Sequence, residues 1–369
     1  MPKRGPQIRD PKRVVYLWGA GATQAEASYL GALRINLLML DNEELGEGVA
    51  TRILTRLPAW RNAFGADRGT DIEKLVSLLA ASNVDRYHKL AEKIRKLYFE
   101  DICKSLAAAG VLMNPELAIG LLTMHGDSQF KKQETLTGII TTNHDGLLQL
   151  AAQRVNAEVN IGIPFRSNDI TQAETRSTPP LLHLHGSFTW TFGLPIEVSL
   201  LDKTSAYSPK TVWIPPTILK EAKDYPFNKL AGLAYELLSR NCDVLRVVGS
   251  ALTQNDWNIL SLIFNAQRHA ELTKGAPFRV ELIMPHGAGI RIKDDCSYLK
   301  NLTPIGFLSD GDFTAYKERG EGQAPTSEMK NPLFYWMKQK IMFHRNRGEF
   351  VRPLALAIAK IAGDPGGGP

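Results

Sequence analysis

Short apolar runs that end in small or polar residues recur along this chain, and they constrain its fold more than any other feature. Three of them, at residues 14–18, 137–140 and 244–248, are typical of short buried strands. Segments with helical spacing of apolar residues lie between the runs. Because strands that alternate with helices favour a parallel sheet covered on both faces, we predict an α/β fold with a doubly wound parallel sheet.

One long stretch interrupts this alternation. From residue 71 to residue 122 the apolar residues recur at helical spacing, with no strand pattern among them. We therefore expect an inserted layer of three or four helices at about residues 70–125. Residues 189–208 are expected to be irregular, because glycine and proline interrupt them. Further strands are expected at 37–40, 179–182, 212–216 and 279–283, and helices at 24–33, 145–155, 230–239 and 256–267.

The two ends of the chain differ from its middle. Residues 1–13 are rich in Lys and Arg, which predicts a flexible basic arm. Such an arm is either solubilising or weakly attracted to nucleic acid or to an acidic partner. One domain is expected at residues 14–345. Residues 346–369 are expected to form a C-terminal tail with a disordered, Gly/Pro-rich end.

Composition excludes several classes of protein. With 44% hydrophobic and 22% charged residues among 369, the chain can bury a sizeable core, and its net charge is +6. The three cysteines are too far apart for a metal-binding pair and odd in number for a disulfide framework. The N-terminus is charged, and no apolar stretch reaches the roughly 18 residues of a membrane helix. We therefore expect a cytoplasmic protein without a membrane segment.

The first apolar run ends in a glycine turn, Gly19-Ala20-Gly21-Ala22-Thr23. The two glycines would let the backbone approach a pyrophosphate, toward which a following helix directs its amides. A full dinucleotide fingerprint needs a third glycine, where Gln24 stands. Asp41 occupies the place of the ribose-binding acid of a Rossmann-like fold, about twenty residues farther on. A tight structural turn explains the glycines equally well.

Polar residues follow the second run, in Thr141-Thr142-Asn143-His144-Asp145. At the carboxyl end of a strand in an open sheet, such residues face the usual ligand crevice. Asn143 is suited to hold ribose hydroxyls or a water, and Asp145 to accept from an amide. Both residue types also cap helices very often, so that alternative stays open.

Another polar segment, His183-Leu184-His185-Gly186-Ser187, ends the run near residue 182. Histidine is the side chain best suited to accept a proton near neutral pH. In a regular strand His183 and His185 share a face, so their spacing does not decide which is the base. His144 is a weaker candidate. The alternative role for each is a buried structural histidine.

The fourth segment follows the strand at residues 244–248. It is Gly249-Ser250-Ala251-Leu252, with Asp256 downstream. In this order the glycine turn, Asn143 to Asp145, His185-Gly186 and this segment resemble the motifs of the sirtuin family. The resemblance is greatest to its bacterial, zinc-free, sirtuin-like branch, and it spans roughly residues 14–285. It implies a Rossmann-like NAD-binding domain.

The resemblance also implies roles for individual residues. Asn143 would hold the nicotinamide ribose or a water, and Asp145 would bind the nicotinamide carboxamide. His185 would be the general base, because Gly186 follows it. The remaining NAD contacts implied by the motifs are Gly19, Ala20, Gly21 and Thr23 at the phosphates, and Gly249, Ser250 and Asp256 farther along the chain.

Departures from the family pattern change the implied chemistry. The C-x-x-C pairs that hold zinc in protein-deacylating relatives are missing, so no zinc is expected. The Gly162-Ile163-Pro164-Phe165-Arg166 string resembles a family loop but stands at the wrong place, so we treat it as coincidence. The expected activity is hydrolysis of NAD to nicotinamide and ADP-ribose, or to a cyclic product. The alternatives are a protein deacylase, a non-enzymatic subunit that senses NAD or ADP-ribose, and an ordinary dinucleotide oxidoreductase.

Zinc-free bacterial relatives of this kind often act in antiphage defence, where depletion of NAD must be gated. By this analogy we expect a homo-oligomer. We also expect control by a partner such as a HerA-type ring ATPase or an Argonaute-type protein.

Overall fold

A computed structural model describes most of the chain between residues 10 and 307. The described residues are 10–26 and 72–307, except 109, 113, 127, 174–176, 203–204, 216, 218–219, 221–222 and 254–255. The expected strand at 37–40, Asp41 and the expected C-terminal tail at 346–369 therefore lie outside the described residues. So do most of the basic arm and of the helix expected at 24–33.

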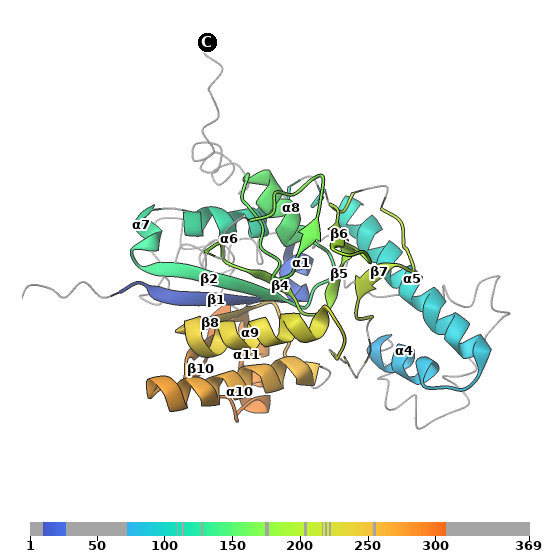
Figure 1. The fold of residues 1–369 in the computed structure, drawn as a ribbon. Helices are drawn as coiled ribbons and strands as arrows, with labels where there is room; N and C mark the ends of the chain where they lie inside the picture. The colour runs from blue at the N-terminus through green and yellow to red at the C-terminus, as the bar shows by residue number, and fades with distance from the viewer. Residues whose placement is uncertain are drawn as a thin grey trace, which may run out of the picture.

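A six-stranded sheet forms the centre of the molecule (Figure 1), with the strand order β10-β9-β8-β1-β2-β4. Every neighbouring pair is parallel, which confirms the predicted α/β class. The strands are β1 (Lys12–Trp18), β2 (Glu134–Thr141), β4 (Leu181–His183), β8 (Val244–Val248), β9 (Arg279–Pro285) and β10 (Leu302–Phe307). The order reverses at β1, since later strands lie on both of its sides. Ligands of open α/β sheets bind at the carboxyl ends of the strands beside such a reversal.

Helices cover both faces of this sheet, as a doubly wound fold requires. In Figure 1, α6 and α8 lie on one face, while α9 lies on the other with α10 beside it. None of the described helices is long and apolar enough to cross a membrane. The described helices are α1 (Ala20–Glu26), α4 (Ile72–Ala80), α5 (Asp85–Ala108), α6 (Glu116–Gly126), α7 (Ser128–Lys131), α8 (Leu147–Arg154), α9 (Phe227–Asn241), α10 (Trp257–Lys274) and α11 (His286–Asp295).

A second, smaller sheet corrects the prediction that residues 189–208 are irregular. Its strands are β3 (Phe165–Arg166), β5 (Gly186–Thr191), β6 (Ile196–Val198) and β7 (Thr211–Trp213), in the order β3-β6-β5-β7. β5 pairs antiparallel with both β6 and β7. Trp190, Ile196 and Val198 are buried in the same apolar core as the strands of the main sheet, so the small sheet packs against the main one. The strand expected at 212–216 exists as β7, but in this second sheet.

The inserted helical layer is present as α4, α5, α6 and the short α7. In Figure 1, α5 extends past the small sheet, away from the strands β8 to β10. Phe99 and Leu106 of α5 are buried in a cluster with Phe188 of β5 and Leu150 of α8. The layer is therefore anchored to the small sheet and to α8.

The N-terminal arm is shorter than predicted. Lys12 and Arg13, which were expected to be flexible, are the first residues of β1. The Arg13 side chain pairs with Asp243 at 2.6 Å, and the Arg13 amide donates to the same carboxylate at 3.0 Å. This pairing extends the central strand by two residues.

A buried arginine joins four strands of the main sheet. Arg246, whose side chain is 4% exposed, lies on β8. Its guanidinium donates to Glu134 at 2.6 and 2.7 Å, to Glu281 at 3.0 Å and to the Tyr16 hydroxyl at 3.0 Å. A buried charge is costly unless it is paired, so Arg246 can be buried here only because Glu134 and Glu281 pair with it.

Replacement of this arginine tests its structural role. Arg246→Ala is expected to lower the free energy of unfolding by about 3–5 kcal/mol, because Glu134 and Glu281 would stay largely buried after losing the guanidinium that bonds both. Urea denaturation followed by circular dichroism measures the change. Arg279→Ala is the control, because that side chain is 51% exposed. Its Nη2 lies 3.5 Å from Glu281 Oε1. Equal losses in the two variants would contradict the role of Arg246.

Candidate functional site

Polar side chains gather at the carboxyl ends of the neighbouring strands β1, β2 and β4. Thr23 follows β1, Asn143 and Asp145 follow β2, and His185 follows β4. All four are buried, with exposed fractions between 2% and 7%. The sequence segments expected to form one site do therefore meet at one edge of the sheet.

The glycine turn packs directly against the turn that follows β8. The Gly19 amide donates to the Val248 carbonyl at 2.8 Å, and the Gly21 amide donates to the Gly249 carbonyl at 2.7 Å. A Cβ on Gly249 would lie 2.2 Å from the Ala22 nitrogen, and Gly249 has a φ of +62°. Both turns therefore need glycine for mutual contact. The amides of Gly19 and Gly21 are occupied inside the protein, so in this arrangement they do not face a phosphate.

The other two residues near these turns that were expected to contact NAD differ in their exposure to solvent. Ala20 is exposed at the start of α1, and Ser250 is half-buried beside Gly19. The absent Cβ of Gly19 would lie 2.5 Å from the Ser250 Cα. The three residues thus lie together at the reversal of strand order between β1 and β8.

Asn143 and Asp145 connect the turn after β2 to the turn after β1. Asn143 Nδ2 donates to the Gly19 carbonyl at 3.0 Å and to Thr23 Oγ1 at 2.9 Å. Thr23 Oγ1 donates to Asp145 Oδ2 at 2.5 Å. Asp145 Oδ1 accepts from the amide of Leu147, the first residue of α8, at 3.0 Å, while the N-cap residue of that helix is Gly146. Burial raises the pKa of Asp145, against the effect of its hydrogen bonds.

The structure separates the two histidines that strand periodicity left equivalent. β4 ends at His183, and Leu184 and His185 form a turn, so the assumption of a regular strand through residue 185 was wrong. His183 Nδ1 lies 3.2 Å from the Asn143 carbonyl oxygen, and its ring packs against Trp190. His185 Nε2 instead faces α10, at 3.3 Å from Asn258 Nδ2.

Burial keeps these imidazoles neutral. It lowers the pKa of His185 to about 3 and that of His183 to about 4. His144 has a structural environment, because its Nε2 lies 3.0 Å from the Ile214 carbonyl and its ring packs against Trp213 and Phe188. Of the three histidines, His185 is the one that meets a polar side chain of another element.

Lys220 is a site residue that the sequence did not indicate. Its ammonium group lies 2.7 Å from Glu73 of α4 and 2.9 Å from Asp256 at the start of α10, and its side chain is 5% exposed. Asp256, expected to contact NAD, is thus paired with this lysine. After desolvation, the positive charge of Lys220 is the next largest cause of the lowered pKa of His185.

Comparison with known proteins adds no family assignment. No protein-family model matches the chain, and no curated protein matches it significantly. Within the described part of the chain, no group of three or more His, Cys, Asp and Glu residues is arranged to hold a metal ion. The site residues are therefore judged by their geometry.

Substitution of Gly249 tests the contact between the two turns. Gly249→Ala is expected to destabilise the protein by about 1–3 kcal/mol, because the new Cβ clashes with backbone and the positive φ is strained. Gly232→Ala is the matched control, since a Cβ there meets nothing within 4 Å. That change removes a helical glycine and is expected to be stabilising by roughly 0.5–1 kcal/mol. Thermal and urea unfolding measure both, and a neutral Gly249→Ala would contradict the clash.

The buried histidines predict loss of stability in acid. Burial lowers the pKa of His125 and His183 to about 4, of His185 to about 3, and of His144 well below 6.5. Between these values and 6.5 the unfolded chain binds more protons than the folded one, so stability falls as pH falls. Burial raises the pKa of Asp145, which favours the folded state as pH falls, but this is one group against four histidines.

Urea denaturation at a series of pH values measures this dependence. The free energy of unfolding is expected to be level near pH 7.5 and to fall from pH 6.5 toward pH 4; it also falls in alkali, because burial raises the pKa of the Cys103 and Cys242 thiols. Each histidine contributes up to about 1.4 kcal/mol per pH unit. An unchanged free energy between pH 7 and pH 5 would show that these imidazoles are solvated.

Proposed function

We propose that this chain hydrolyses NAD at the bond between nicotinamide and ribose, releasing nicotinamide and ADP-ribose. One observation carries the proposal. Asn143, Asp145 and His185 lie buried at the carboxyl ends of the adjacent strands β2 and β4, next to the strand-order reversal where open α/β sheets bind nucleotides. The order of motifs that resembles zinc-free sirtuin-like proteins supports the same activity.

Each side chain has a chemical task in this reaction. Cleavage of the glycosidic bond passes through an oxocarbenium-like state, so the ribose and the leaving group must both be held in position. The Asp145 carboxylate accepts from the nicotinamide carboxamide, in competition with Thr23 Oγ1. Asn143 orients the ribose or the attacking water.

His185 removes the proton. Its imidazole is neutral at physiological pH and so has a lone pair to accept a proton, but burial, which lowers its pKa to about 3, makes it a weak base while the site is closed. A water oxygen bonds to the ribose carbon as the glycosidic bond breaks, and the electron pair of that bond leaves with nicotinamide. The water's proton passes to His185 and then to solvent.

The burial of these groups fits a gated enzyme. His185 is 2% exposed, and Asn143 and Asp145 are each 7% exposed, so NAD must displace covering groups to reach them. Uncontrolled NAD hydrolysis harms a cell, and a closed resting site limits it. We propose that self-assembly into a homo-oligomer or a partner such as a HerA-type ATPase or an Argonaute-type protein opens the site in antiphage defence. NAD as substrate implies action in the cytoplasm.

Nicotinamide release tests the function. Purified protein is incubated with NAD and free nicotinamide is separated by chromatography, while calorimetry measures NAD binding. Asn143→Ala and His185→Ala are expected to lower the cleavage rate by about 10²-fold or more, because each removes a group that acts on the reacting atoms. His88→Ala, at an exposed position on α5, is the control.

The outcomes separate the function from the assigned roles. Cleavage that survives both substitutions would contradict the roles of Asn143 and His185. Because the resting site is closed, the assay is run with the protein alone and with a candidate HerA-type or Argonaute-type partner added, and wild-type protein that neither binds nor cleaves NAD in either case would contradict the function itself. Thermal unfolding of each variant checks that a loss of activity is not a loss of fold.

A further inference from the structure

Asn258, near the start of α10, is the side chain from another element that reaches the ring of His185. Its Nδ2 lies 3.3 Å from His185 Nε2. An amide nitrogen is always a donor, and a neutral imidazole has one donor and one acceptor nitrogen. Nε2 is therefore the acceptor in this contact.

The other ring nitrogen agrees with this assignment. A backbone interaction with Thr142 raises the pKa of His185, which is the effect of a carbonyl that accepts from the ring. Because Nε2 faces Asn258, we assign the donated hydrogen to Nδ1. Both contacts then favour one tautomer, with the hydrogen on Nδ1 and the lone pair on Nε2.

The lone pair on Nε2 is the one that a base needs. A ribose hydroxyl or a water is also a donor, so it must compete with the Asn258 amide for the same acceptor. Asn258 thus orients the base and occupies its accepting position until a substrate group replaces it.

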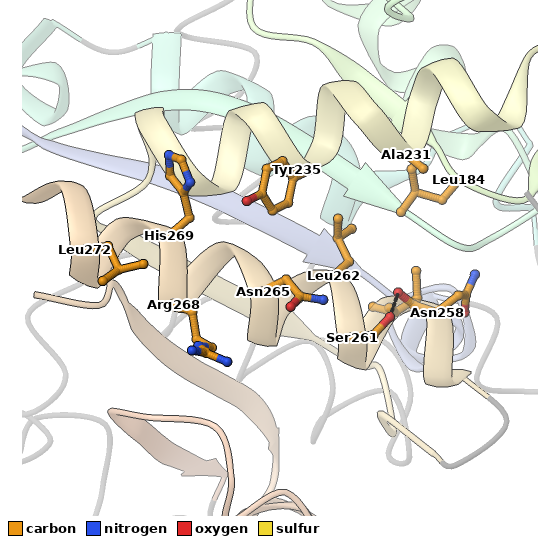
Figure 2. Close-up of a pocket in the computed structure, with 11 residues that line it drawn as sticks. Leu184, Ala231, Tyr235, Asn258, Ser261, Leu262, Asn265, Arg268, His269 and Leu272 are labelled. Atoms are coloured by element: carbon orange, nitrogen blue, oxygen red, sulfur yellow. Dashed lines mark hydrogen bonds between the residues drawn. The ribbon is translucent and has the colours of Figure 1, made fainter.

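A cavity beside Asn258 leaves room for a substrate group to replace it at His185 Nε2. A cavity of about 610 Å³ lies between α9 and α10, and both Asn258 and Leu184, the residue before His185, line it. Figure 2 shows Asn258 and Leu184 at one end of this cavity and Leu272 toward the other. The buried Oδ1 of Asn258 has no hydrogen-bond partner in the described structure. The side-chain amide is therefore hydrogen-bonded through its nitrogen alone.

We propose that Asn258 is a positioning residue for His185: it holds the imidazole with Nε2 as the acceptor and gives up that acceptor to the substrate hydroxyl or water. The inference deepens the proposed NAD hydrolysis and rests on it for its catalytic meaning. The tautomer itself does not depend on the reaction.

Nitrogen-15 NMR of histidine-labelled protein tests the positioning without NAD. The His185 signals are identified by their loss in His185→Gln. In the wild type, His185 is expected to carry its hydrogen on Nδ1 at pH 7. In Asn258→Ala the Nε2 signal shifts and the pKa of His185 rises toward 6.5, because the donor to the neutral form is lost and water enters.

Two further variants make the test specific. Asn258→Asp replaces the donor by an acceptor of the same shape, so the hydrogen of His185 is expected to move to Nε2 and its pKa to rise. Asn265→Ala removes the same side chain from an exposed position on the same helix and cavity, and is expected to match the wild type. A His185 ring with unchanged tautomer and titration in both Asn258 variants would overturn the proposal.

Kinetics of NAD cleavage give the catalytic readout. Asn258→Ala is expected to lower kcat with little change in KM, and to move the ascending limb of the kcat–pH profile to higher pH. Asn265→Ala is expected to leave both unchanged. A wild type that fails to cleave NAD both alone and with the candidate partner contradicts the proposed function, whereas unaltered NMR signals contradict the role of Asn258, so the two failures are distinct.

Discussion

The backbone contact between the two glycine turns is the constraint on which the site depends. Gly21 and Gly249 approach so closely that neither tolerates a Cβ, and their turns follow β1 and β8, the two strands at which the sheet order reverses. In many dinucleotide-binding folds, glycines at such a turn let a ligand approach. Here the same property lets one turn of the protein approach another, which closes the edge of the sheet at this point.

The other polar groups of the site are connected to that contact by hydrogen bonds. Asn143 donates to the carbonyl of Gly19, Thr23 donates to Asp145, and Asp145 in turn accepts from the first amide of α8. These hydrogen bonds connect the turns after β1 and β2, and the side chains that form them are buried away from water. The sequence left helix capping and a site role open for Asp145; the N-cap residue of α8 is Gly146, and the two oxygens of Asp145 accept from Thr23 and from the Leu147 amide.

Much of the main sheet could be predicted from sequence, because β-branched runs such as 244–248 carry a local signal and parallel strands end at a common edge. The small sheet could not, since strands of three residues such as Ile196–Val198 are too short for alternation to be read. The end of β4 at His183 was missed for the same reason. Lys220 was beyond prediction because its partners, Glu73 and Asp256, are 147 and 36 residues away and no local pattern relates them. Asn258 lay within a correctly predicted helix, but only the fold brings it to His185.

The central strand of the sheet is also its first in the chain, and this has a consequence for how the protein is made. Tyr16 of β1 pairs in register with Ile139 on one side and with Arg246 on the other. During synthesis β1 emerges long before either neighbour, with both of its edges and its large aromatic side chains unpaired. Non-local strand pairing of this kind is slow and exposes aggregation-prone edges. The glycine turn that β1 carries can meet its counterpart only after Gly249 has been translated, so the site is completed late, when most of the chain already exists.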